Sequence, residues 1–474
     1  MAISIFNTMS GTKEQFKPLE GKKVKMFVCG QTVYDDAHLG HAKTYIAFDI
    51  VARWLRHSGY DLKYAQNITD VDDKIIARAH ERNMEPLELA RYYEKRFFED
   101  MERIGVKQNV DIYPESSKYI SAMRDQIQAL ADKGYAYYLD GDIYYDVSKF
   151  NDYTKLSRMN IEELSKHRIE PKEGKRNSYD FALWKSAKPG EPKWRIDVVI
   201  GGKKFELEGR PGWHIEDTAM TYTIFGPQYD IHGGARELIF PHHTNEIAQA
   251  EGAYAVKPFV KYWMHSGMLY IRGQEMHKSL KNFITIREFL EKYSAEILRF
   301  MIASTHYRKE INITDNYIDS ARRNLYYLYS SIGIFYNMKE SGGSGVQLLE
   351  KAKVFAKEFS EAMDDDFNTP LAIKKLMIFA RELRNYASGA SGIDADTKAE
   401  IMKIVSEYAG IIGVLAEENY KKPIDKDVYK LIEEREALRK EKKYEEADAI
   451  RSKLLSEFGI VVEDSDYGPV WYAK

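Results

Sequence analysis

A strand, a helix and a second strand follow one another near the start of the chain, and this order constrains the fold most. Residues 24–30 form an apolar run closed by glycine, which is the pattern of a buried strand. Residues 39–56 carry apolar side chains at helical spacing, and residues 62–68 indicate a second strand. Strands joined through a helix lie parallel, so the sequence predicts an α/β domain with a doubly wound, Rossmann-like parallel sheet. Such sheets bind ligands beyond the carboxyl ends of their strands, where Cys29 is expected to lie.

The remainder of the chain divides into segments of different texture. At 474 residues it is too long for one ordinary hydrophobic core, so several domains are expected. Short tyrosine-rich, strand-like pieces between residues 115 and 210 indicate an insertion, whereas the pattern after residue 295 is helical and includes one charged helix over 427–458. We therefore expect a sheet domain at 1–114 and 211–294, an inserted domain at 115–210, a helical connection at 295–345, an α-helical bundle at 346–420 and a small C-terminal α/β domain at 425–474.

Charge and cysteine usage limit the possible environments. The formal net charge is −3, so a nucleic-acid partner must be bound by local basic faces, such as residues 166–176 or Arg308 and Lys309. Such runs are more often only solvated surface. Cys29 is the only cysteine, which excludes an intramolecular disulfide and favours a reducing compartment. Residues 1–16 lack the pattern of a signal peptide and no apolar run approaches the ~20 residues of a membrane helix, so we expect a cytoplasmic protein without membrane attachment.

The sequence His38-Leu39-Gly40-His41 stands between the first predicted strand and the first predicted helix. Its two imidazoles are three positions apart, so at the start of a helix they lie on one face. The N–H groups and the positive dipole end of a helix N-terminus suit a phosphate group, and Gly40 has no side chain to keep a nucleotide away from the backbone. On its own, however, the pattern fits two surface histidines beside a turn equally well.

A second candidate feature is Met276-His277-Lys278-Ser279, in a loop that contains glycine and lysine. A mobile lysine in such a loop can bring a cation to a phosphate transition state. Considered alone, the loop is more simply interpreted as a solvated turn.

Together these two features resemble the signature motifs of class I aminoacyl-tRNA synthetases, with residues 38–41 at the HIGH motif and residues 275–279 at the KMSKS motif. Within that class the chain is similar to the cysteinyl-tRNA synthetase family in particular. The similarity extends over nearly the whole chain in the family's order, so chance is not a serious explanation. The matching stretches are residues 27–35, 67–74, 209–216, 230–234, 240–246, 364–370 and 447–451.

The resemblance implies an enzyme that activates L-cysteine with ATP as cysteinyl-adenylate and transfers cysteine to tRNA(Cys). Mg²⁺ would accompany ATP, and the protein would act as a monomer. The resemblance also assigns the insertion to the acceptor end of the tRNA, residues 295–345 to the tRNA stem and residues 346–420 to the anticodon. The implied catalytic residues are His38, His41 and Lys278; these three with Gly40 and Asp230 would bind ATP, and Thr69 and Trp213 would line the cysteine pocket.

The family further implies one zinc ion per chain, which holds the thiolate of the substrate. Cys29, His242 and Glu246 stand at three of the family's four ligand positions. His242 and Glu246 are four residues apart and share one face of a helix, although without the resemblance they would be an ordinary surface pair. At the fourth position the family has a second cysteine, whereas this chain has Asp217. A carboxylate is an accepted zinc ligand of the same charge with a harder donor atom, so we expect Asp217 to bind zinc; the alternative is that it faces away.

The lysine loop departs from the family as well. Glu275 and His277 replace its first lysine and its first serine, which leaves Lys278 as the only motif lysine, with Arg272 or Lys281 as candidates to compensate. Two other functions stay open: a cysteine ligase of the same ancestry that acts on an amino-sugar, and a non-catalytic tRNA-binding relative. The long helical C-terminal region argues against the amino-sugar ligase, because a small acceptor needs no anticodon reader.

Overall fold

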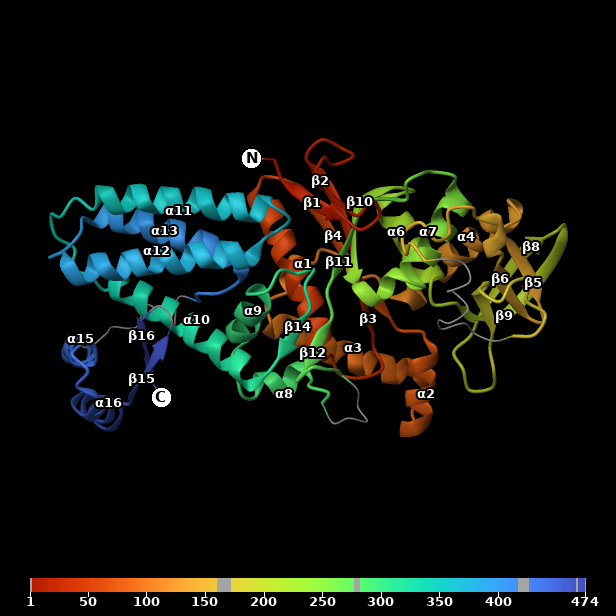
Figure 1. Ribbon diagram of the computed structural model, residues 1–474. Coiled ribbons are helices and arrows are strands. Elements are labelled where there is room, and N and C mark those ends of the chain that lie inside the picture. Colours follow the sequence, from red (N-terminus) through yellow and green to blue (C-terminus); the bar gives the residue numbers. More distant parts are fainter. Residues whose placement is uncertain (1, 160–171, 277–281, 417–425, 466–467, 474) are drawn as a thin grey trace. The chain divides into compact units, whose positions relative to one another are not determined.

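The computed structural model describes residues 2–159, 172–276, 282–416, 426–465 and 468–473 (Figure 1). The chain forms two compact units. The sheet unit comprises Ser4–Met268 and Lys278–Phe289, and the helical unit comprises Met1–Ile3, Leu269–His277 and Leu290–Lys474. Among the helices in these described ranges, none is both long and apolar enough to cross a membrane.

A four-stranded parallel sheet forms the centre of the sheet unit. Its order is β11(Val260–Ser266), β10(Tyr229–Ala235), β3(Lys23–Thr32) and β4(Asp61–Thr69) (Figure 1). Strand β3 is apolar on both faces, with Met26, Phe27 and Val28 fully buried, as is typical of a parallel strand between helices. The predicted doubly wound parallel sheet is thereby confirmed. The chain passes from β3 outward to β4 and later from β10 outward to β11, so the topological switch point lies between β3 and β10.

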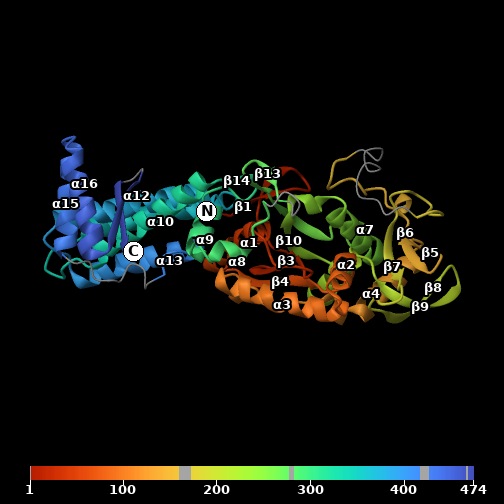
Figure 2. The same ribbon diagram turned by 90° about the horizontal axis from the view of Figure 1, so that it is seen from below.

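Helix α1(Leu39–His57) connects β3 to β4 and confirms the helix predicted over 39–56. Its N-cap is His38, and most of its residues from Ala42 to Leu55 are buried. Because the strands are parallel, the first turns of α1, of the helix before β10 and of the helix after β10 lie at the carboxyl edge of the sheet. The other helices around the sheet are α2(Asp73–Arg82), α3(Pro86–Arg103), α6(Ile215–Phe225) and α7(His242–Tyr254) (Figure 2).

A second, antiparallel sheet lies within the segment predicted to be an insertion. Helix α4(Ile120–Asp132) precedes it, and its order is β5(Ala136–Leu139), β6(Asp142–Tyr145), β7(Phe181–Ser186), β9(Lys203–Pro211) and β8(Trp194–Ile200). This segment does not form a compact unit of its own, because Ile127 and Trp184 share one hydrophobic core with Phe27 of the parallel sheet. Figures 1 and 2 show α4 and these five strands grouped together.

Several short elements complete the sheet unit. They are the hairpin β1(Ser4–Asn7) and β2(Thr12–Gln15), the single turns η1(Lys107–Asn109), η2(Ser116–Lys118), η3(Val147–Lys149) and η4(Arg236–Ile239), and most of α8(Ile286–Leu290).

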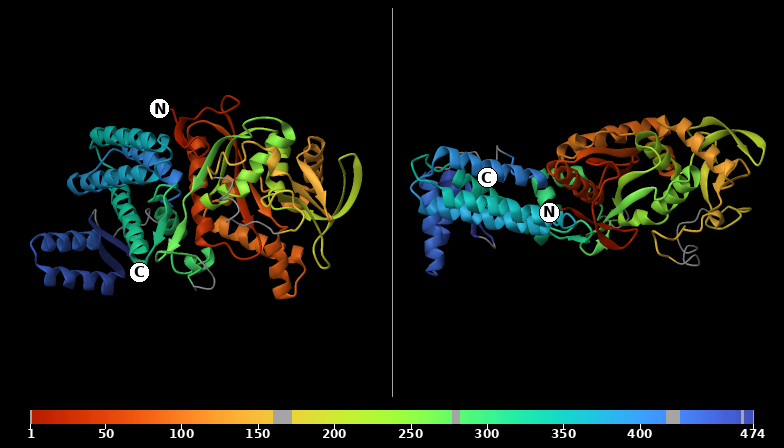
Figure 3. Two further views of the ribbon diagram at one scale, coloured as in Figure 1. Left: turned by 45° about the vertical axis from the view of Figure 1, so that its right-hand side comes forward. Right: turned by 90° about the horizontal axis from the view of Figure 1, so that it is seen from above.

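The helical unit contains a bundle of long helices, seen side by side in Figure 3. Its helices are α9(Ala295–Ala303), α10(Asp315–Tyr336), α11(Val346–Asp364), α12(Thr369–Gly389) and α13(Ala395–Ile412), with a small sheet of β13(Gln274–Glu275), β12(Leu269–Ile271) and β14(Ile311–Ile313).

The end of the chain corrects one prediction. Instead of a single helix over 427–458 there are two, α15(Lys426–Lys440) and α16(Tyr444–Phe458), followed by the hairpin β15(Ile460–Ser465) and β16(Gly468–Ala473). The chain turns at Lys442, which has a left-handed φ of 63°. The turn allows Ile432 of α15 and Leu454 of α16 to enter one small core. No glycine or proline marks this turn, so the sequence pattern did not reveal it.

Candidate functional site

A cavity of about 460 Å³ opens at the carboxyl edge of the parallel sheet, beside the switch point. Cys29 and Thr32 of β3 and Asn67 and Thr69 of β4 form part of its wall. The first turns of α1, α6 and α7 supply His38, His41, Asp217 and His242, and the segment after β10 supplies Glu237. The cavity therefore unites side chains from distant parts of the chain, as predicted for a doubly wound fold.

The four predicted metal ligands converge beside this cavity, where Cys29, Asp217 and His242 line the wall and Glu246 is buried behind it. One ligand atom from each of Cys29, Asp217, His242 and Glu246 lies within 4.8 Å of the others. Asp217 Oδ2 is 3.4 Å from Cys29 Sγ and 3.0 Å from His242 Nε2, and Glu246 Oε1 is 3.1 Å from the same nitrogen. Ligands of a tetrahedral zinc ion are roughly 3.3–3.7 Å apart, given metal–ligand distances of about 2.0–2.3 Å. The geometry therefore fits a single ion, and Asp217 faces the other ligands.

The electrostatics of this cluster also fit a cation. Burial, reinforced by Asp217 and Glu246, raises the pKa of the Cys29 thiol well above its usual value. Burial likewise raises the pKa of Glu246, with Asp217 and Glu216 adding to the effect. Neither carboxylate oxygen of Glu246 has a hydrogen-bond partner among the described residues, although both are buried. Several acidic groups without compensation are costly in a protein interior, and a bound dication removes that cost.

Two histidines that were not predicted complete a second potential set of ligands. Cys29 and Glu246 also lie within 4.8 Å of nitrogens of His232 and His243. Both histidines are fully buried and, unlike Asp217 and His242, do not line the cavity. Each is 3.1–3.2 Å from Cys29 Sγ through Nε2. The only sequence signal for His232 and His243 was their position inside the matching stretches 230–234 and 240–246. The two histidines are not separated by a spacing that is typical of metal ligands.

Other side chains hold these two imidazoles in place. His232 Nδ1 lies 2.6 Å from the hydroxyl of Tyr229, and His243 Nδ1 lies 2.8 Å from Nε2 of His265. Burial lowers the pKa of both His232 and His243 well below the usual value, so both are neutral near pH 7. A neutral imidazole with one nitrogen fixed in this way presents the other toward the sulfur in a defined direction.

His38 and His41 form the start of α1. His38 Nδ1 accepts a hydrogen bond from the N–H of Gly40 at 3.1 Å, and His41 Nδ1 accepts one from the N–H of His38 at 3.3 Å. The rings stack with centroids 3.8 Å apart. Burial, then the neighbouring His38 and Lys74, lowers the pKa of His41 well below its usual value. His41 is therefore a neutral hydrogen-bonding group in the cavity wall rather than a fixed cation.

Thr69 and Trp213, the predicted substrate-pocket residues, both line the cavity. The hydroxyl of Thr69 donates to Glu216 Oε1 at 2.8 Å, which fixes its direction. The indole of Trp213 stacks on His242 with centroids 4.5 Å apart. Asn67 donates from Nδ2 to Asp217 Oδ1 at 2.7 Å, which leaves Oδ2 directed at the cluster. Asn67 and Glu216 thus position predicted site residues, and their only sequence signal was their place inside the matching stretches 67–74 and 209–216.

Asp230 requires a correction. It is the second residue of β10, at the amino end of the strand, whereas the cavity is at the carboxyl end. Its buried carboxylate accepts hydrogen bonds from the N–H groups of Leu19, at 2.7 Å, and Lys25, at 2.9 Å. Both oxygens therefore hold backbone near the opposite edge of the sheet, and Asp230 is removed from the ATP-binding set. Lys278, predicted to act on phosphate, and Lys281 lie outside the described residues.

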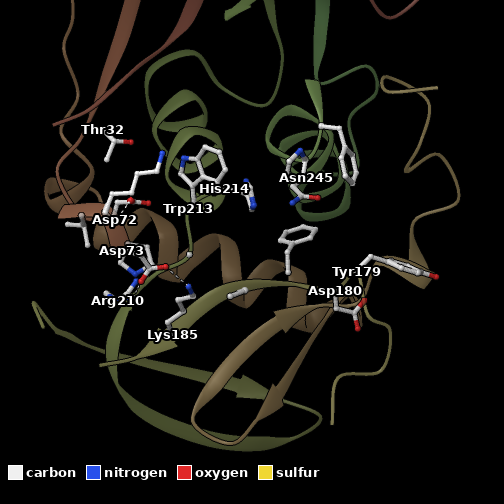
Figure 4. A pocket seen from close by; sticks show the side chains of 18 of the residues that line it. Thr32, Asp72, Asp73, Tyr179, Asp180, Lys185, Arg210, Trp213, His214 and Asn245 are labelled. Carbon is white, nitrogen blue, oxygen red and sulfur yellow. Dashed lines mark hydrogen bonds and ion pairs between the residues drawn. The ribbon is translucent and has the colours of Figure 1, made fainter. Parts of the chain in front are cut away.

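A second cavity of about 280 Å³ adjoins the first. Thr32, Lys74, Trp213, Phe240 and Pro241 line both cavities. Figure 4 shows Asp73, Lys185 and Arg210 on one side of this second cavity and Asn245 and Tyr179 on the other, with the rings of Trp213 and His214 between them.

Comparisons with known proteins identify the family of the chain. Residues 15–323 match the family described as tRNA synthetases class I (C) catalytic domain. Residues 358–416 match the DALR domain, and residues 422–471 match the cysteinyl-tRNA ligase anticodon binding domain. The chain belongs to the cysteine–tRNA ligase family.

Similar proteins cover the whole chain. A cysteine–tRNA ligase of Thermococcus onnurineus is 43% identical over 482 residues, covering 99% of each chain. One of Geobacter sulfurreducens is 41% identical over 494 residues, covering 100% of each. Among solved structures, Mycobacterium tuberculosis methionyl-tRNA synthetase in complex with methionyl-adenylate has a TM-score of 0.58 at 14% identity, with 82% of this chain and 89% of that chain covered. At that identity the structural similarity shows the fold alone.

Proposed function

We propose that this chain activates L-cysteine with Mg-ATP to form cysteinyl-adenylate and then charges tRNA(Cys). The observation that supports this most directly is the cluster of Cys29, Asp217, His242 and Glu246, three of which line a cavity that His38 and His41 also line. A soft-metal site and a phosphate-binding helix start in one cavity suit a reaction between a thiol-bearing amino acid and a nucleotide.

Cys29, Asp217, His242 and Glu246 would hold Zn²⁺. When bound, the ion supplies a Lewis acid that grips the substrate thiolate and so separates cysteine from serine, a pair that pocket shape alone distinguishes poorly. Compared with the cysteine of the family, Asp217 keeps the charge of the ligand set and replaces sulfur by a harder oxygen, which makes the ion more electron-poor. Thr69, fixed by Glu216, and Trp213, stacked on His242, form the wall around the rest of the amino acid.

The start of α1 binds ATP in this proposal. The positive dipole end of this helix favours phosphate, and the neutral ring of His41 can donate a hydrogen bond to a phosphate oxygen. The carboxylate of Glu237, which also lines the cavity, suits the hydroxyl pair of the ribose. Lys278 stabilises charge that develops on the phosphate during attack by the cysteine carboxylate.

In the second step a ribose hydroxyl oxygen of the tRNA attacks the carbonyl carbon of the adenylate. The bond from that carbon to the phosphate oxygen breaks, AMP leaves with the electron pair, and the hydroxyl proton passes to the departing phosphate. We assign residues 115–210 to the acceptor end, residues 295–345 to the stem and residues 346–420 with 425–474 to the anticodon region. The match of residues 422–471 to an anticodon binding domain disfavours the amino-sugar ligase. The proposed enzyme is a cytoplasmic monomer.

Two assays on the same preparation test this function. Cysteine-dependent ATP–pyrophosphate exchange measures the first step, and transfer of labelled cysteine to tRNA(Cys) or to an amino-sugar measures the second. Activity in the exchange assay with charging of tRNA alone is expected. Tight binding of tRNA without exchange would identify a non-catalytic relative, and transfer to the amino-sugar would identify the other ligase.

A further inference from the structure

The second cavity has a reactant-sized volume and no role in the first step. At about 280 Å³ it is close to the lower limit of the roughly 300–1,000 Å³ typical of small-ligand sites, so it has room for about one nucleoside and not for an RNA stem. It shares the side chains of Trp213, Lys74 and Thr32 with the reaction cavity. A group seated in it therefore lies directly beside the metal cluster and the start of α1.

The walls of this cavity suit an unstacked base. Aromatic rings of Tyr153, Tyr179, Phe181, Trp213 and Phe240 line it, and such rings provide stacking surfaces for single-stranded RNA. Figure 4 shows labelled rings on more than one side, so a planar group can be held between them. The ammonium group of Lys74, at the boundary with the reaction cavity, can approach the phosphate of a nucleotide that lies across that boundary.

Asn245 supplies a polar edge among these rings. Its side chain is only 2% exposed, and its Oδ1 accepts a hydrogen bond from the hydroxyl of Tyr153 at 2.5 Å. This contact fixes the orientation of the amide group. Because a carbonyl oxygen can accept two hydrogen bonds, Oδ1 can still accept one more. Among the described residues Nδ2 makes no hydrogen bond, although it belongs to a side chain that lines the cavity. A carboxamide that presents both a donor and an acceptor matches the N7 and N6 edge of adenine.

We propose that this second cavity binds the unpaired 3′-terminal adenosine of the tRNA, with Asn245 reading N7 and N6 of the base. This inference rests on the proposed function, because the adenylate and the amino acid fill the reaction cavity and the tRNA terminus is the reactant that remains. The terminal ribose then lies at the shared wall formed by Trp213, where its hydroxyl reaches the adenylate carbonyl. Asn245 acts as a specificity-determining residue for transfer and takes no part in adenylate formation.

The test measures single-turnover transfer from preformed cysteinyl-adenylate, on the full-length protein loaded with zinc. Wild-type protein receives tRNA(Cys) ending in adenosine or in 7-deazaadenosine, which lacks only the N7 acceptor. Transfer to the 7-deaza tRNA should be slower by about tenfold, within the range for a lost side-chain contact to a base edge. The variant Asn245→Ala should transfer to both tRNAs at the same reduced rate. Its pyrophosphate exchange and zinc content should equal those of the wild type.

A pair of tyrosine variants tests the stacking surface. Tyr179→Ala removes a half-buried ring of the cavity and should slow transfer severalfold, on the scale of one lost base–aromatic stack, without changing pyrophosphate exchange. Tyr138→Ala is the matched control, because Tyr138 is a 39% exposed tyrosine of β5, in the same inserted segment, that stacks on Phe205 and does not line the cavity.

The assignment is overturned if Asn245→Ala still distinguishes adenosine from 7-deazaadenosine, or if wild-type protein does not distinguish them. It is also overturned if Asn245→Ala loses zinc and pyrophosphate exchange together, because Asn245 then supports the adjacent ligand Glu246. Failure of the proposed function has a different signature, since wild-type protein would then show no cysteine-dependent exchange.

Discussion

Asp217 offers the sharpest test of the proposed metal site, because it is the one proposed ligand at which this chain departs from the pattern of the family that it resembles. Its Oδ1 accepts the hydrogen bond from Asn67 at 2.7 Å, and its Oδ2 lies 3.4 Å from Cys29 Sγ and 3.0 Å from His242 Nε2. Oδ2 therefore lies where a metal ligand atom would lie, whereas a residue that only orients a ligand through a hydrogen bond would lie farther from the other ligands. Loss of a supporting partner already lowers metal affinity about 10- to 100-fold, so Asp217→Ala should lower zinc affinity by about 100-fold or more.

Removing Asp217 has the opposite effect on the metal-free protein. Burial first, and then repulsion from Asp217, raises the pKa of Cys29 and of Glu246, so the loss of Asp217 lowers the free-energy cost of burying Glu246 in the metal-free protein. Asp217→Ala should consequently raise the melting temperature measured in a chelator while reducing the increase that zinc produces. Asp217→Cys is the matched control, because it restores the family's donor with the same charge and should keep zinc and cysteine activation. Asp217→Asn keeps an oxygen without the charge and should be intermediate.

The measurements are zinc affinity by chelator competition, metal content by mass spectrometry and cysteine-dependent pyrophosphate exchange. Stoichiometric zinc and normal exchange in Asp217→Ala would refute the assignment. The ion would then be held without Asp217, and His232 or His243 would become the first candidates for the missing ligand, since both lie within reach of Cys29.

Three further predictions concern other parts of the chain. Lys278→Ala should lower the rate of pyrophosphate exchange at saturating ATP by about 10²-fold, the scale of one lost charge-stabilising donor, and a loss below about threefold contradicts its role. Deletion of residues 417–474 should leave exchange intact and abolish most tRNA charging; equal charging by both chains would place the RNA-binding region elsewhere. Zinc affinity should rise with pH, because the raised pKa values of Cys29 and Glu246 keep them protonated in the metal-free protein and zinc must displace those protons. Calorimetry in buffers of different ionisation enthalpy counts the released protons, and a count of zero rules out this linkage.

Local sequence patterns were sufficient to predict the central parallel sheet and its first helix. The apolar run that became β3 and the helical periodicity of α1 were sufficient for the parallel sheet, because burial on both faces requires continuous apolar residues. The spacing of His242 and Glu246, with the family resemblance, predicted two ligands that the structure brings together. The break between α15 and α16 was missed because the turn at Lys442 depends on packing between the two helices and not on a local glycine.

The remaining errors concern which edge of the sheet a residue occupies. Asp230 was expected beside ATP because of the family resemblance, yet the direction of β10 places it at the amino edge. His232 is two residues farther along the same strand and lies 3.2 Å from Cys29 Sγ. The sequence of β10 alone does not determine the direction in which the strand runs in the sheet, and therefore not which of its ends lies at the cavity. That information comes from pairing with β3 and β11, which is a long-range property.

The insertion supports the proposed metal site although none of its residues is a predicted ligand. Three of the proposed ligands are on α6 and α7, and polar contacts from the inserted segment hold these helices. Thr218 of α6 donates to Gln126 Oε1 of α4 at 3.0 Å, and the hydroxyl of Tyr145 of β6 donates to the carbonyl of Ala248 in α7 at 2.9 Å. The shared hydrophobic core makes these contacts rigid. The segment that faces the tRNA terminus in our proposal therefore also contacts the helices that carry the proposed zinc ligands, so a displacement of the insertion is expected to change both the acceptor position and the geometry of the proposed metal site.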